Sequence, residues 1–221
     1  MYFKLMQKVV AFFASLITIF VPVEPSEGID PTLPLKNINP NPVAEAVLSQ
    51  DMTIMSYNVK ISGDGLRDPD KRAPLITDTI LTEAPDSFGL QEADKAWVER
   101  IAAGLSDYAY IAKYRDDGIT EGESSAIFYL KDKFELVESN TFWISETPEK
   151  ESKFHDAACY RICSFVVLRN KNTGKLLAHF NTHLDHVSTE AQNLGGSLIA
   201  EKVGEIKSKY GEIATVITGD F

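Results

Sequence analysis

The sequence predicts an α+β fold, in which antiparallel or mixed sheets are covered by helices on their outer faces. Three observations support this prediction. Many short segments alternate apolar and polar residues, which is typical of half-buried strands. Several of these segments are joined in pairs by short turns, as in hairpins. Other segments carry apolar residues at helical spacing, and such helices pack one face against a sheet.

The expected strands are rich in β-branched and aromatic residues and are bounded by turn-forming residues. They cover residues 52–61, 86–91, 108–114, 124–130, 134–137, 142–145, 159–168, 175–182 and 212–218. We expect 124–130 and 134–137 to pair as a hairpin across the turn at 131–133. A second hairpin is expected to join 159–168 to 175–182 through the Asn-Lys-Asn-Thr-Gly turn at 170–174.

Three helices are expected between these strands. The first covers residues 71–82 and is stopped by Ala84-Pro85. Asp94 is placed to cap the second, which carries Trp97, Ile101 and Leu105 on one face. Thr189 and Gln192 match a capping box for the third. This helix has an apolar stripe made of Leu194, Leu198, Ile199, Val203 and Ile206.

The N-terminal part of the chain differs in composition from the rest. Lys4 and Lys8 precede an uncharged run from Val9 to Val23, which is typical of a signal peptide and short for a transmembrane helix. Residues 1–28 are therefore expected to be a signal peptide or an N-terminal anchor. Residues 29–50 form a Pro-rich linker, and 51–221 the folded domain. We expect an exported protein, secreted or anchored outside the cytoplasm, with membrane contact only through an uncleaved N-terminal segment.

The charge balance limits the kinds of partner. A formal net charge of −10 argues against a protein that grips nucleic acid through a broad basic surface. It is compatible with an enzyme that meets phosphate through a bound cation, because clustered carboxylates bind divalent ions. Cys159 and Cys163 are expected to be free thiols, since four residues along a strand span roughly 13 Å.

Four expected strands end in polar residues that the fold itself does not require. Each one alone has an ordinary explanation as a turn residue or a solvated strand end. Alternation along 175–182 sends His179, Asn181 and His183 to one face of the strand. A zinc site of His179, His183 and His186 is rejected, because His179 and His183 are roughly 13 Å apart on a strand. The four ends are Asn58, Glu92, the pair Asn181 and His183, and Asp220.

In this order the four motifs are specific, and the chain resembles the endonuclease/exonuclease/phosphatase family, which includes deoxyribonuclease I. The resemblance covers the whole of the expected domain. The matching motifs are Ser56-Tyr57-Asn58, Leu90-Gln91-Glu92, the Asn-Thr-His-Leu-Asp-His run at 181–186, and Gly219-Asp220-Phe221. The resemblance implies a four-layer α/β sandwich with two mixed, mainly antiparallel sheets and outer helices, whose last strands are missing from this chain.

The resemblance also implies roles for individual residues. Glu92 would bind Mg²⁺ or Mn²⁺, with Asn58 close to the ion. His183 would contact the scissile phosphate, and Glu123 would orient His183 and favour its charged form. Asp220 would orient or deprotonate the attacking water. Arg161 and Asn181 are weaker candidates for phosphate contacts.

The implied activity is metal-dependent hydrolysis of a phosphoester. The substrate stays open among nucleic acid, nucleotide, sugar phosphate and phospholipid headgroup, and no specific protein partner is expected. The family pattern continues after Phe221 with an Asn and a closing Ser-Asp-His motif, so we expect little or no activity from the 221-residue chain. The alternatives are an inactive remnant or a secreted binding module.

Overall fold

The computed structural model describes residues 52–221. The signal peptide or anchor expected over 1–28 and the linker expected over 29–50 lie outside this range. Within it, none of the helices combines the length and the apolar character that crossing a membrane requires.

In the part of the chain that the structure describes, eight strands form two four-stranded sheets. The first sheet has the order β1-β2-β4-β3, and β1 and β2 are parallel while the other pairs are antiparallel. The second has the order β5-β6-β7-β8, and only β7 and β8 are parallel. Both sheets are therefore mixed and mainly antiparallel. The strands are β1 (Ile54–Asn58), β2 (Ser87–Gln91), β3 (Tyr108–Ile111), β4 (Ile127–Leu130), β5 (Phe134–Trp143), β6 (Ile162–Asn170), β7 (Leu176–His183) and β8 (Ala214–Asp220).

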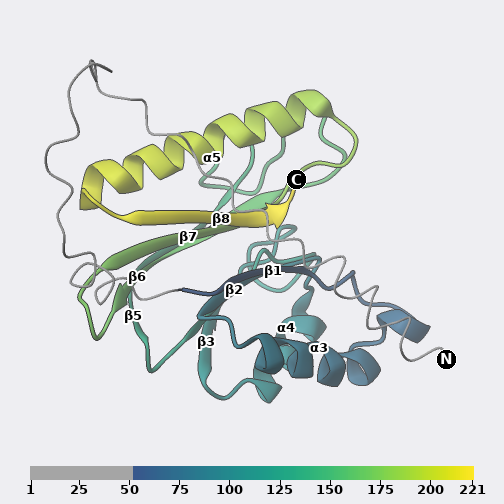
Figure 1. Cartoon of the computed structure of the whole chain (residues 1–221). Coiled ribbons are helices and arrows are strands. Elements are labelled where there is room, and N and C mark those ends of the chain that lie inside the picture. The colour runs from purple at the N-terminus through teal and green to yellow at the C-terminus, as the bar shows by residue number, and fades with distance from the viewer. Residues whose placement is uncertain (1–51) are drawn as a thin grey trace, which may run out of the picture.

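The helices lie outside the two sheets, which stack on each other (Figure 1). Helix α5 (Thr189–Tyr210) covers the outer face of the β5–β8 sheet, while α3 (Pro69–Glu83) and α4 (Lys95–Gly104) cover the other sheet. A short 3₁₀ helix, η1 (Gly65–Arg67), precedes α3. This arrangement confirms the expected α+β sandwich of four layers.

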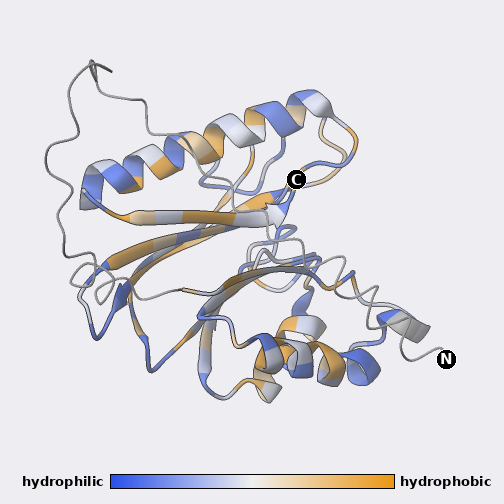
Figure 2. Ribbon diagram, viewed as in Figure 1, coloured by the Kyte–Doolittle hydropathy of each residue, from blue (hydrophilic) through white to orange (hydrophobic). Residues whose placement is uncertain are grey.

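Apolar residues fill each of the three spaces between the layers. One cluster packs α3 and α4 on the first sheet around Trp97, Phe88 and Ile80. A second packs α5 on the other sheet and includes Phe180 and Ile199. The third lies between the sheets. The strands are largely hydrophobic in Figure 2, whereas α5 alternates between hydrophilic and hydrophobic residues, as expected for a helix with one solvent-exposed side.

Polar side chains also cross the space between the sheets. The imidazole of His179 on β7 is fully buried, with Nδ1 2.8 Å from Ser87 Oγ and Nε2 2.9 Å from Thr218 Oγ1. Ser87 Oγ also donates a hydrogen bond to the carbonyl oxygen of Phe128 at 2.7 Å. Burial lowers the pKa of His179 to about 3, and the ring is therefore neutral at pH 7.

The expected hairpin between 124–130 and 134–137 is wrong. Strand β4 already pairs with β2 on one side and β3 on the other, so it has no free edge for a third partner. The turn at 131–133 instead carries the chain into the second sheet, where β5 pairs with β6. The segment at 142–145 is also not a separate strand, because β5 continues through a bulge between Leu136 and Glu138 to Trp143.

Several boundaries differ from the expected ones. Ser188, rather than Thr189, caps α5 and accepts a hydrogen bond from the backbone N–H of Ala191. Strand β6 begins at Ile162, so Cys159 lies in the loop before it, and both cysteines are free. Asp94 caps α4 as predicted, by accepting from the backbone N–H of Trp97. The second predicted hairpin, between β6 and β7, is confirmed.

Candidate active site

Four strands from both sheets end at one side of the sandwich. Strands β1 and β2 are parallel, and their registered partners Asn58 and Gln91 end them together. Strands β7 and β8 are also parallel, with His183 paired to Asp220 at their ends. The two sheets touch at this point, since Gly219 N–H donates to Ser56 Oγ at 3.2 Å. Asn58 and Asp220, which are 162 positions apart in the sequence, are thereby brought together.

Two carboxylates share one amide at this meeting point. The Nδ2 of Asn58 donates to Glu92 Oε1 and to Asp220 Oδ2, at 2.8 Å each. The second oxygen of Glu92 accepts from the backbone N–H of Ile61 at 2.9 Å. Burial would raise the pKa of Glu92, but the N–H of Ile61, the amide of Asn58 and the charge of Lys60 hold it below its usual value. Glu92 is therefore ionised at neutral pH.

Glu92 also has an unusual backbone conformation. It follows β2 directly and has a φ of 57°, in the left-handed region that residues with a side chain seldom occupy. Such backbone strain is concentrated at functional sites, because the surrounding structure must hold it in place. In this conformation the Glu92 carboxylate accepts the hydrogen bond from Asn58.

His183 is neutral in this structure. Its burial, followed by the charge of Arg161, lowers its pKa to about 4, although Asp220 and Glu92 act in the opposite direction. The contacts of His183 Nδ1 with Glu123 at 3.8 Å and of Nε2 with Asp220 at 3.9 Å are thus not ion pairs at pH 7. The structure places Glu123 next to His183, and the expectation that this carboxylate orients the imidazole and favours its charged form stays a prediction.

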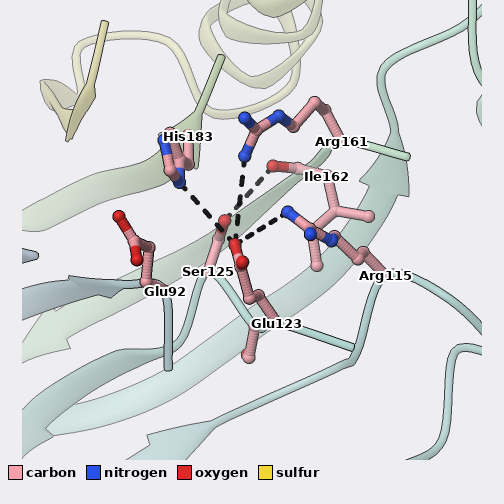
Figure 3. A pocket seen from close by; sticks show the side chains of 8 residues that line it. Glu92, Arg115, Glu123, Ser125, Arg161, Ile162 and His183 are labelled. Carbon is pink, nitrogen blue, oxygen red and sulfur yellow. Dashed lines mark hydrogen bonds and ion pairs between the residues drawn. The ribbon is translucent and has the colours of Figure 1, made fainter. Parts of the chain in front are cut away.

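Glu123 lies behind His183 and is held by two arginines (Figure 3). Arg115 Nη1 donates to Glu123 Oε2 at 2.7 Å, and Arg161 Nη1 lies 3.9 Å from the same oxygen. Burial raises the pKa of Glu123 despite these two positive charges. Arg115 belongs to the same loop as Glu123, and its backbone N–H donates to the Glu123 carbonyl at 3.0 Å.

Arg161 precedes β6 and is 5% exposed. Its Nη2 lies 3.1 Å from His186 Nδ1, so the guanidinium is placed between His186 and Glu123. His186 also belongs to a group with Cys159 and Asp185 whose possible ligand atoms lie within 4.8 Å of one another. A cation there would face the Arg161 charge, and the Asp185 carboxylate already accepts three backbone hydrogen bonds.

Asn181 does not reach the surface of the site. It is fully buried, and its Nδ2 donates to the carbonyls of Leu90 and Ala126. Its Oδ1 accepts from Gln91 Nε2 at 2.7 Å and from Thr218 Oγ1 at 2.9 Å. Both ends of the amide are used between the sheets, so Asn181 positions the strand ends and has no donor left for a phosphate.

A second group of possible ligand atoms belongs to Glu92, His183 and Asp220, and these atoms also lie within 4.8 Å of one another. The two carboxylates supply oxygen ligands of the kind that a small divalent cation prefers. The Asn58 Nδ2 group lies between the two carboxylates, where a cation would compensate the same negative charge. The residues present therefore fit a divalent metal ion.

No role was expected for Arg115 or Ser124 from the sequence. Arg115 reaches Glu123 only through the fold of the loop between β3 and β4. Ser124 is buried and forms isolated bridges with Ala93 and Tyr114. Neither residue ends a strand, so no pattern in the sequence distinguishes them from other loop residues.

Comparison with known proteins agrees with this geometry. No protein-family model and no curated protein matches the chain. Solved structures do match. An endonuclease/exonuclease/phosphatase from Bacteroides vulgatus is 36% identical with a TM-score of 0.74, over 78% of this chain and 66% of that one. A family protein from Bacteroides thetaiotaomicron is 37% identical with a TM-score of 0.73, over 77% and 61%.

A mannosyl-6-phosphatase from Bacteroides thetaiotaomicron is also 37% identical with a TM-score of 0.73, over 77% of this chain and 65% of that one. The chain belongs to the endonuclease/exonuclease/phosphatase family. It spans slightly less than two thirds of the length of these relatives. The family's DNase I-like fold accounts for the two mixed sheets and the outer helices.

Proposed function

We propose that this protein is a phosphoester hydrolase that depends on Mg²⁺ or Mn²⁺. The observation that supports it is the meeting of Asn58, Glu92, His183 and Asp220 at four strand ends. Membership of a family that contains a sugar phosphatase supports the same reaction class. Glu92 would hold the cation, with Asn58 beside it. When bound, a divalent cation supplies positive charge that stabilises the developing charge on phosphoryl oxygens.

The remaining residues have complementary tasks in this proposal. Asp220 has a side chain that is 51% exposed, so water reaches it, and it orients or deprotonates the attacking water. His183 donates a hydrogen bond to a phosphoryl oxygen. Arg161 adds positive charge close to His183 and Glu123. Charge stabilisation of this kind is usually the largest contribution to catalysis of such reactions.

Among possible substrates we favour a small phosphorylated sugar. The net charge of −10 opposes the binding of a long polyanion. The mannosyl-6-phosphatase relative, at 37% identity, makes a sugar phosphate the first substrate to test. Nucleotides, nucleic acid and phospholipid headgroups are the competing classes.

Metal binding tests the site without relying on turnover. Titration calorimetry measures the affinity for Mg²⁺ and Mn²⁺ of the unmodified protein, of Glu92→Gln and of Glu83→Gln. Glu83 is exposed at the end of α3, so Glu83→Gln is the control. We expect Glu92→Gln to weaken binding at least tenfold, on the order of 1.4 kcal/mol, and Glu83→Gln to leave it unchanged. Equal affinity of all three proteins contradicts the assignment of Glu92.

Hydrolysis is tested with mannose 6-phosphate, a nucleotide and single-stranded DNA, each with and without EDTA. For a form of the protein that continues past Phe221, we expect release of phosphate from the sugar ester, abolished by EDTA and by Glu92→Gln. Faster cleavage of DNA would overturn the sugar phosphate as substrate while leaving the hydrolase in place. A secreted binding module instead predicts no rise of the melting temperature with divalent metal.

A further inference from the structure

Lys60 lies in the loop that follows β1 and has a φ of 64°, in the left-handed region. Among residues 52–221, three residues other than glycine have a positive φ: Lys60, Ala84 and Glu92. Two of them, Lys60 and Glu92, are hydrogen-bonded to Asn58. The β-carbon of lysine makes this conformation unfavourable, so the surroundings of Lys60 must hold it there.

The carbonyl groups of the two peptide units that flank Lys60 are anchored to α3 and α4. The carbonyl of Val59 accepts a hydrogen bond from Arg72 Nη1 of α3 at 2.7 Å. The carbonyl of Lys60 accepts from Trp97 Nε1 of α4 at 2.9 Å, and the side chain of Trp97 is fully buried. The side chain of Lys60, by contrast, is exposed. These contacts therefore fix the backbone of Lys60 rather than its ammonium group.

The N–H groups of the same two peptide units contact the candidate active site. Lys60 N–H donates to Asn58 Oδ1 at 2.9 Å, and Ile61 N–H donates to Glu92 Oε2, also at 2.9 Å. All four polar groups of these peptide units are thus hydrogen-bonded, two to helices and two to residues of the site. Because each peptide unit is planar, its C=O and N–H move together. The contacts with α3 and α4 consequently fix the two N–H groups as well.

These contacts decide which way the Asn58 amide is turned. Its oxygen accepts from Lys60 N–H, and its nitrogen donates to Glu92 Oε1 and Asp220 Oδ2 at 2.8 Å each. The opposite orientation would place the amide nitrogen against another donor and the amide oxygen against two carboxylates. A bound cation would reduce the second of these effects, because it attracts amide oxygens. The N–H of Lys60 opposes the opposite orientation with or without a cation.

We propose that Lys60 is a positioning residue of the active site. Its left-handed backbone holds its N–H on Asn58 Oδ1, and this contact keeps the Asn58 amide nitrogen on Glu92 and Asp220. Asn58 then acts on the cation site by aligning the two carboxylates, and its oxygen is not given to the ion. The effect on a cation rests on the proposed function, whereas the orientation of Asn58 is a property of the metal-free protein.

Substitutions of Lys60 that differ in their tolerance of the left-handed conformation test this role. Asparagine occupies that region much more often than other residues with a side chain, whereas a β-branched residue is an outlier there. Lys60→Asn and Lys60→Val remove the same charge and introduce side chains of similar size. We therefore expect Lys60→Asn to keep the contacts of Asn58 and Lys60→Val to break them. Lys60→Ala carries less strain than Lys60→Val and should lie between the two.

Exchange of the Asn58 side-chain amide protons with water is the first readout, measured by NMR on the metal-free protein. The signals are identified by their absence from Asn58→Ala. We expect slow exchange in the unmodified protein and in Lys60→Asn, because the amide nitrogen donates to two carboxylates. Lys60→Val should lose this protection. Equal exchange rates in Lys60→Val and Lys60→Asn overturn the proposal.

Magnesium affinity, measured by titration calorimetry, is the second readout. We expect Lys60→Val to bind Mg²⁺ about 10–100-fold more weakly than Lys60→Asn. Equal affinities of these two variants for Mg²⁺ contradict the proposed effect of Lys60 on the cation site.

Ala84→Val is the matched control, because it places valine at another left-handed residue. Ala84 has a φ of 45° and precedes β2, whereas Glu92 follows the opposite end of this strand. Ala84→Val should leave both readouts unchanged, and an effect equal to that of Lys60→Val overturns the proposal. Absence of Mg²⁺ binding in the unmodified protein would instead contradict the proposed function, and the exchange rates would still decide the role of Lys60.

Discussion

The amide nitrogen of Asn58 lies 2.8 Å from Asp220 Oδ2, which joins the end of a strand in one sheet to the end of a strand in the other. The same nitrogen donates to Glu92 at 2.8 Å. One neutral side chain thus holds two carboxylates from different sheets close together. The candidate metal site and the closure of the sandwich at this end consequently depend on the same residue.

Replacing Asn58 by Ala should affect both the stability of the fold and the affinity for a divalent metal, and the two can be measured separately. The loss of two hydrogen bonds to charged groups is expected to lower stability by about 1.5–3 kcal/mol, offset in part by exposure of the Asp220 side chain. Divalent metal affinity is expected to fall about 10–100-fold. Calorimetric titration and urea unfolding measure the two quantities. Asn172→Ala, in an exposed turn, is the control and should change neither. Unchanged metal affinity in Asn58→Ala would contradict the proposed role.

Gly89 is expected to tolerate no side chain. A Cβ at this position would lie 2.4 Å from Asn181 Oδ1 and 2.4 Å from Thr218 Oγ1, both of which belong to the buried network between the sheets. Gly89→Ala should therefore destabilise the protein by about 1–3 kcal/mol, which corresponds to a melting temperature lower by several degrees. Thermal unfolding followed by circular dichroism measures the change.

Gly204→Ala is the matched control for this prediction. Gly204 lies on α5, is exposed, and has no atom within 4 Å of an added Cβ. Because alanine has the higher helix propensity, we expect a gain of up to about 1 kcal/mol. Equal and small effects of the two substitutions would show that the sheets do not approach as closely at Gly89 as the structure indicates.

His179 should make the stability depend on pH. Its pKa is lowered from an ordinary value of 6.5 to about 3 in the folded state. Between these values the unfolded chain binds a proton that the folded protein does not, so the free energy of unfolding falls with decreasing pH. The expected slope is about 1.4 kcal/mol per pH unit from this group. His183, whose pKa is lowered to about 4, adds a contribution of the same sign.

Urea unfolding from pH 7.5 down to pH 4 measures this slope. His179→Asn is expected to be less stable at pH 7.5, because contacts with Ser87 and Thr218 are lost, and to show a shallower slope. His155→Gln alters an exposed histidine and serves as the control. A slope in His179→Asn as steep as in the unmodified protein would rule out His179 as its source.

Glu123 and Arg115 should be energetically coupled. Their side chains are only 12% and 16% exposed, and their hydrogen bond is 2.7 Å long. Glu123→Gln leaves Arg115 with only the more distant carboxylate of Asp116, at 3.6 Å. Arg115→Met leaves Glu123 with only Arg161, at 3.9 Å. Each is expected to destabilise the protein, while the double substitution costs less than their sum, with a coupling of about 1–3 kcal/mol. Additive effects in urea unfolding would show that the pair contributes no interaction energy.

The sequence by itself predicted the architecture and the strand ends of the candidate site. Periodicity located most strands and all three long helices, because alternation and helical spacing are local properties that burial on one face imposes. The order of Asn58, Glu92, His183 and Asp220 identified the family. Each of these residues ends or follows a strand, so its position along the chain already indicates its place at the edge of a sheet.

Only the tertiary structure decided which strands pair and which groups lie behind His183. Strand β5 does not pair with β4, which precedes it in the sequence, because β4 already pairs with β2 and β3. Which edges of a strand are free depends on the whole sheet. Asn181 became a buried link between sheets because Gly89 lets the two backbones approach there. Arg115 reaches Glu123 through a loop, and the low pKa of His183 follows from its burial beside Arg161. Desolvation and long-range contacts arise only when the layers pack, so no local pattern records them.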